Sequence, residues 1–204
     1  MTQRPTSQRG EAGPAAAGGR AGGSAAAAGT GVAQQAARTG ARPAPARTLL
    51  VGMGNPILSD DAVGIRLAGA LATRLGPRPG LDVLAECCVG GLNLVDVIAG
   101  YDRVVVIDSI MTGGGTPGTW YRFDARALRD TLNLRNVHDT NFATALELGR
   151  TMGTHLPTDD EIHVFAVEVA DTATFSETMT PPLEAAFPEL VEEIGAEVEA
   201  LLAR

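Results

Sequence analysis

The chain has no lysine and only two cysteines, and its sixteen basic residues are all arginines. The absence of lysine indicates a biased genome composition more than a function. The two cysteines are neighbours, Cys87 and Cys88, and a bridge between adjacent residues would be strained and could not join distant parts of a fold. A disulfide framework is therefore excluded, and a reduced, cytoplasmic protein is expected.

Signals for export or membrane insertion are also missing. The sequence contains no apolar run of about 18 residues, and its beginning has neither a twin-arginine pair nor the apolar segment of a signal peptide. Secretion and membrane spanning are therefore not expected. Neither Gly-x-Ser-x-Gly nor His-Glu-x-x-His occurs, which disfavours the usual serine hydrolase and zinc peptidase mechanisms.

Composition divides the chain into a tail and one domain. Residues 1–46 are almost entirely Ala, Gly, Arg, Gln, Thr, Ser and Pro, which cannot bury enough apolar surface to fold, so this tail is expected to be disordered. A transit peptide, a basic nucleic-acid tail or a misassigned start are alternatives. Through Arg47 the net charge is +5, whereas the rest carries ten arginines and 23 acids, a net of −13. Residues 47–204 can form one domain, and their acidity disfavours a nucleic-acid partner.

From Arg47 onward, strand-like and helix-like segments alternate. Short apolar runs predict strands, and apolar residues repeating every three or four positions predict helices. The alternation predicts an α/β domain of three α/β/α layers around a mostly parallel sheet of about five strands. The expected strands are 48–52, 81–86, 103–108, 118–123 (a candidate edge strand) and 162–169. The expected helices are 63–75, 92–99, 141–152 and a C-terminal helix in which Pro188 separates a short first turn from the longer part.

The segment from Thr48 to Arg66 is the most informative part of the domain. Its strand is followed by a glycine-broken loop and a helix, with Ser59 expected to cap the helix and Asp60 and Asp61 in its first turn. A Rossmann-like nucleotide site is disfavoured because Ile57 stands where the fingerprint needs a third glycine. Two acids at the helix start would also repel a pyrophosphate.

Three residues are candidate metal contacts. Asp61 and Asp108 follow or end separate strands, where open α/β sheets build ligand sites, and His138 is expected in a polar loop just before a helix. Each also has an ordinary explanation, since Asp61 could favour the helix N-terminus, Asp108 could cap a turn and His138 could be solvated. Two carboxylates and an imidazole suit nickel or zinc with positions left open.

The order of these segments resembles that of the hydrogenase maturation proteases, endopeptidases that trim the C-terminus of nickel-iron hydrogenase large subunits. The resemblance extends from about Arg47 to Leu202. It is carried by GMGNPILSDDAVGIR, ECCVGGLNL (Glu86 to Leu94), RVVVIDSI (Arg103 to Ile110), VHDTNFATALELG (Val137 to Gly149) and VFAVEVADTATFSETMTPPLEAAFPELV (Val164 to Val191).

The resemblance implies a function and assigns residues to it. Asp61, where the family often has Glu, would contact nickel together with Asp108 and His138, and the substrate would be a nickel-loaded large-subunit precursor. Glu86 and the pair Gly90-Gly91 match the family's substrate-docking loop, which here contains the two cysteines, expected to be small buried thiols although soft metal ligands are an alternative.

Further expectations concern the metal and the partner. Three ligands fall short of the four that hold a structural zinc, so the nickel would arrive with the substrate and no tightly bound metal of the enzyme's own is expected. A monomer is expected. The alternative function is a protein that checks nickel occupancy without cutting.

Overall fold

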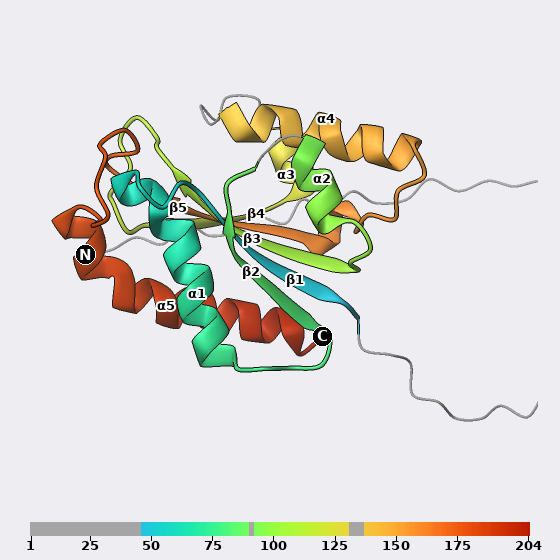
Figure 1. Ribbon diagram of the computed structural model, residues 1–204, viewed down its shortest axis with the longest axis horizontal. Helices are drawn as coiled ribbons and strands as arrows, with labels where there is room; N and C mark the ends of the chain where they lie inside the picture. Colours follow the sequence, from blue (N-terminus) through green and yellow to red (C-terminus); the bar gives the residue numbers. More distant parts are fainter. Residues whose placement is uncertain (1–45, 90–91, 131–136) are drawn as a thin grey trace, which may run out of the picture. The chain divides into compact units, whose positions relative to one another are not determined.

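A five-stranded sheet with helices on both faces forms the core of the unit Pro43–Arg204 in a computed structural model of the protein (Figure 1). The structure describes residues 46–89, 92–130 and 137–204, so the expectation of a disordered tail lies outside the described residues. The strands are β1 (Thr48–Met53), β2 (Leu81–Cys87), β3 (Arg103–Ile110), β4 (Trp120–Asp124) and β5 (Ile162–Glu168). Their order in the sheet is β2-β1-β3-β5-β4. All neighbours pair in parallel except β4, which is antiparallel to β5 at one edge, and the predicted three-layer α/β fold is confirmed.

The helices form the two outer layers. Figure 1 shows α1 (Val63–Leu75) and α5 (Pro181–Leu202) on one face of the sheet, with α2 (Leu92–Ile98) and α4 (Val137–Thr151) on the other. A short helix, α3 (Ala125–Asp130), follows β4 directly, and single 3-10 turns lie at Ser59–Ala62 (η1) and Asp159–Glu161 (η2). None of the described helices is both long and apolar enough to cross a bilayer.

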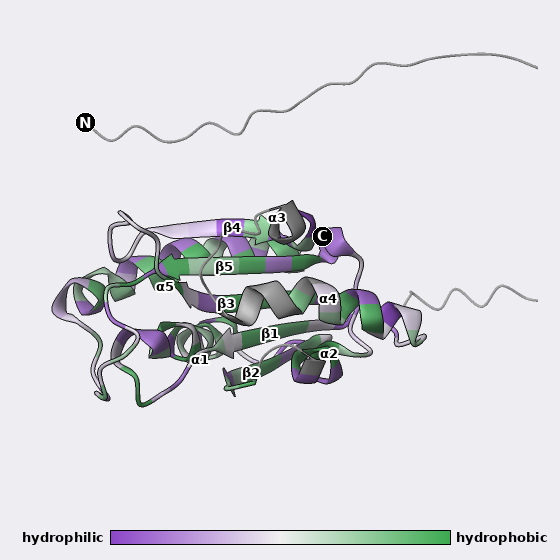
Figure 2. Ribbon diagram, turned by 90° about the horizontal axis from the view of Figure 1, so that it is seen from above, coloured by the Kyte–Doolittle hydropathy of each residue, from purple (hydrophilic) through white to green (hydrophobic). Residues whose placement is uncertain are grey.

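Alternation along the strands creates a core on each face, because successive strand side chains point to opposite sides. Figure 2 shows β1 and β5 largely hydrophobic, whereas the edge strand β4 is paler and more polar. The core beneath α1 and α5 contains Leu50, Val105, Ile107, Phe165 and Val167 from the strands. The core beneath α2 and α4 contains Leu49, Val51, Val104, Val106, Ile162 and Val164.

Some expected boundaries are wrong. Pro188 lies inside a continuous α5 and does not divide it, because buried leucines before and after the proline, Leu183 and Leu190, hold both parts against the same core. This packing outweighs the local cost of a missing N–H. Helix α3 was not predicted. Helix α4 begins at Val137 rather than at residue 141, and β3 continues two residues beyond Asp108.

Candidate functional site

The carboxyl ends of the four parallel strands lie along one edge of the sheet, and the connection after β1 delivers an acid there. Helix α1 starts very close to this edge, since a Cβ at Gly64 would overlap the carbonyl oxygens of Met53 in β1 and Ile107 in β3. Only glycine therefore fits at this position. The approach brings η1, and Asp61 with it, beside the end of β3, where Asp61 contacts Ser109.

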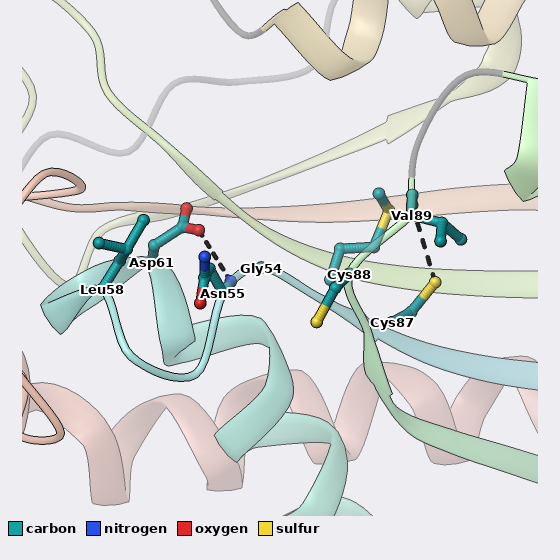
Figure 3. A pocket seen from close by; sticks show the side chains of 8 residues that line it. Gly54, Asn55, Leu58, Asp61, Cys87, Cys88 and Val89 are labelled. Carbon is teal, nitrogen blue, oxygen red and sulfur yellow. Dashed lines mark hydrogen bonds between the residues drawn. The ribbon is translucent and has the colours of Figure 1, made fainter. Parts of the chain in front are cut away.

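Asp61 and Asp108 meet through Ser109, the residue that follows Asp108 in the strand. The Ser109 hydroxyl donates to Asp61 Oδ1 over 2.7 Å, and the Ser109 amide donates to Asp108 Oδ1 over 2.8 Å. The other Asp61 oxygen accepts from the amide of Asn55 over 2.8 Å (Figure 3). Two of the three predicted metal contacts, Asp61 and Asp108, thus share Ser109 as a hydrogen-bond partner. Asp108, however, lies inside β3 rather than at its end, with 6% of its surface exposed.

The residues just before Asp61 have roles that differ from those expected. Ser59 does not cap a helix, since η1 has no side-chain cap and the Ser59 hydroxyl donates to the carbonyl of Thr178 over 3.3 Å. Asp60 is fully buried and accepts hydrogen bonds from the amides of Ala170, Asp171 and Thr180 and from the Thr180 hydroxyl. Asp60 therefore fastens the loop after β5, and Asp61 alone of the two acids lines the pocket described below.

The third predicted contact, His138, lies in the first turn of α4 and not in a loop before it. Because the segment after α4 returns to the amino end of β5, the start of α4 points back toward the carboxyl edge of the sheet (Figure 1). The side chain of His138 lies outside the described residues. Among the side chains that are described, no three His, Cys, Asp or Glu residues are grouped closely enough to hold a metal ion.

Of the residues expected to dock substrate, Glu86 is exposed near the end of β2, whereas Gly90 and Gly91 lie outside the described residues. A pocket of about 200 Å³ opens between this strand end and η1. Figure 3 shows Asp61 and Asn55 on one side and the two cysteines with Val89 on the other. The lining residues are Met53, Gly54, Asn55, Leu58, Asp61, Cys87, Cys88 and Val89. This volume is below the roughly 300–1,000 Å³ of typical cofactor pockets, and it suits a side chain better than a nucleotide.

The two cysteines are free and differ in environment. Cys87 is buried, as expected, and its Sγ lies 3.8 Å from the carbonyl oxygen of Val89. Cys88 is exposed, so the expectation of two buried thiols is wrong for Cys88, whose Sγ lies 4.0 Å from Glu86 Oε1. Partial desolvation, with the nearby charges of Glu86 and Asp61, raises the pKa of the Cys88 thiol. This shift disfavours the thiolate, which is the nucleophilic form of a cysteine.

Two polar residues at this edge escaped the sequence analysis. Ser109 could have been noticed because it follows the strand acid directly. Glu168, with 1% of its surface exposed, ends β5 and accepts from the amide of Thr112 over 2.7 Å and from its hydroxyl over 3.0 Å. Glu168 thereby holds the loop after β3 in place, and no local sequence signal distinguishes it from an ordinary strand acid.

Comparisons with known proteins agree on one family. A model of the hydrogenase maturation protease family matches residues 65–197, well over half of the chain. The hydrogenase 2 maturation protease of Escherichia coli is 32% identical over 73 residues, which are 36% of this chain and 44% of that protein. The sequence match thus spans less than half the length of this relative, and Asp61 lies outside the range of the family match.

Solved structures extend the similarity to most of the domain. The hydrogenase maturating endopeptidase HybD from E. coli superposes with a TM-score of 0.63 at 24% identity, over 76% of this chain and 93% of that one. The solution structure of an endopeptidase from E. coli gives a TM-score of 0.61 at 26% identity, over 72% and 89% of the two chains. The fold described above is therefore the fold of these endopeptidases.

Proposed function

The chain belongs to the hydrogenase maturation protease family, and we propose that it removes the C-terminal peptide of a hydrogenase large-subunit precursor that already carries nickel. Endopeptidase processing of hydrogenases is the role of this family. The observation that carries the proposal is the pairing of Asp61 and Asp108 through Ser109 at the carboxyl edge of the sheet.

The chemistry of these side chains suits a metal that belongs to the substrate. Carboxylate oxygens and an imidazole nitrogen are acceptable nickel ligands, and three of them leave positions open for groups of the precursor. We propose that Asp61, Asp108 and His138 contact the precursor's nickel. Recognition of the ion then makes cleavage conditional on its insertion, in an aspartate- and metal-assisted endopeptidase reaction.

Docking of the precursor is proposed to use the loop after β2. Glu86 is exposed at the end of this strand, next to the pocket that Asp61 lines, and Gly90 and Gly91 continue the same loop in sequence. A pocket of about 200 Å³ can receive one side chain of an extended peptide. We place the whole activity in residues 47–204.

The test is a cleavage assay with chelator-treated enzyme and purified precursor, with and without nickel. We expect mass spectrometry to find a released C-terminal peptide only from the nickel-loaded form. Asp108→Asn and His138→Ala should abolish cleavage with melting temperatures close to that of the unmodified protein. Asp160→Asn is the matched control, because Asp160 is an exposed acid in η2, just before the amino end of β5, and should cleave normally.

Two outcomes would contradict the proposal. Equal cleavage of loaded and empty precursor would exclude nickel as the recognition signal. Nickel-dependent binding with no released peptide would replace the protease by a non-cleaving occupancy checkpoint.

A further inference from the structure

Ser109 links the two acids of the proposed site, although it belongs to neither the predicted metal contacts nor the docking loop. In β3 the two cores alternate strictly up to Ile107, so Asp108 falls on the face of α2 and α4 and Ser109 on the face of α1 and α5. Asp61 comes from η1, on the α1 side. Ser109 therefore spans the strand end, with its amide on Asp108 and its hydroxyl on Asp61.

The contacts of Asp61 leave it little freedom to rotate. One carboxylate oxygen accepts from the amide of Asn55 over 2.8 Å, and the other accepts from the Ser109 hydroxyl over 2.7 Å. Each oxygen keeps a second lone pair for a further partner. Ser109 itself is buried, with 3% of its surface exposed, so water does not compete freely for its hydroxyl. Of the two hydrogen bonds described here, the Asp61 carboxylate would keep only the one from Asn55 if the Ser109 hydroxyl were removed.

We propose that Ser109 is a positioning residue, which holds the Asp61 carboxylate in register with Asp108 for contact with the nickel of the precursor. The inference rests on the proposed function and adds a residue to it. Groups that hydrogen-bond to metal-binding side chains fix their orientation, and removing such a group commonly weakens metal affinity about 10- to 100-fold. In this role Ser109 acts through Asp61 rather than on the precursor itself.

Ser109→Ala isolates the hydroxyl, because the backbone amide that bonds to Asp108 remains. The measurements are the dissociation constants of the stripped enzyme for nickel-loaded and empty precursor, together with kcat and KM for cleavage. We expect Ser109→Ala to weaken binding of the loaded precursor by about 10- to 100-fold while binding of the empty precursor stays unchanged. Ser109→Thr, which keeps a hydroxyl on a β-favouring residue, should restore most of the difference.

The control is Ser176→Ala, which removes a hydroxyl bonded to Thr178 in the loop after β5 rather than to an acid, and it should not change the ratio of the two constants. Should Ser109→Ala melt early, Ser109→Cys keeps the volume with a much weaker donor and should show the same selective loss.

The outcomes separate this inference from the proposed function. If the unmodified enzyme distinguishes loaded from empty precursor and Ser109→Ala does so equally well, the positioning role is wrong and the proposed function stands. Equal weakening toward both precursors, with no rescue by Ser109→Thr, would reduce Ser109 to a structural residue. If the unmodified enzyme makes no distinction, the proposed function fails and the inference fails with it.

Discussion

Replacing Asp60 with alanine should destabilise this protein far more than replacing Asp61, the acid beside it. Asp60 is fully buried and accepts four hydrogen bonds from the loop after β5, three from backbone amides and one from the Thr180 hydroxyl. Asp61 is only partly buried, and it accepts from Asn55 and Ser109.

The expected magnitude follows from the donors left behind. A buried donor without an acceptor costs about 1–3 kcal/mol, and such costs do not simply add where water can enter. We expect Asp60→Ala to lower the free energy of unfolding by about 3–5 kcal/mol, because three amides and one hydroxyl lose their acceptor together. For a domain of this size, that corresponds to a fall in melting temperature of about 10 °C. Asp61→Ala should lower the free energy of unfolding by only about 1 kcal/mol, because removing an acid from an open site often relieves part of the cost of keeping it there.

The assay is denaturant unfolding followed by the fluorescence of Trp120, the chain's only tryptophan, which packs against Phe165 with ring centroids 5.7 Å apart. The slope of the unfolding curve should stay unchanged while the midpoint moves. Asp60→Asn, which keeps the shape but replaces one acceptor oxygen by a donor, should also be strongly destabilised. A loss below about 1 kcal/mol for Asp60→Ala, or an equal loss for Asp61→Ala, would refute the division of roles between the two acids.

Two further substitutions test the packing and the electrostatics of the same fold. Gly64→Ala should lower the stability of the fold by about 1–3 kcal/mol and reduce processing, because the new Cβ meets two backbone carbonyls. Gly69→Ala lies in the same helix with no atom within 4 Å of the new Cβ, so thermal melts should find it neutral or stabilising. Burial lowers the pKa of His163 below its usual 6.5, aided by Arg122. Below about pH 6.5 the unfolded chain therefore binds more protons than the folded one. The stability that this histidine contributes above that pH should be lost toward about pH 5. Urea unfolding at several pH values should show a smaller loss in His163→Gln than in the unmodified protein.

The alternation of strands and helices could be read from the sequence because it depends on local patterns. An unbroken apolar run such as Val104 to Ile107 must be buried on both sides, and the spacing of Val63, Leu67 and Leu71 places one stripe on a helix. These patterns record burial directly, and the parallel sheet follows from their order. The strand acid Asp108 was predicted for the same reason, since a carboxylate at the end of an apolar run is conspicuous.

Only the tertiary structure decided which of the neighbouring acids has which partner. The Asp60 carboxylate bonds to Thr180, 120 residues away, and Asp61 to Ser109, 48 residues away, and no local pattern encodes such distances. These bonds form because Gly64 lets α1 approach the ends of β1 and β3, and because parallel pairing gathers the strand ends at one edge. The sequence by itself determined the fold class and the family resemblance and predicted the acids of the proposed site, whereas backbone convergence assigned Asp60 to holding a loop and gave Asp61 and Asp108 a common hydrogen-bond partner in Ser109.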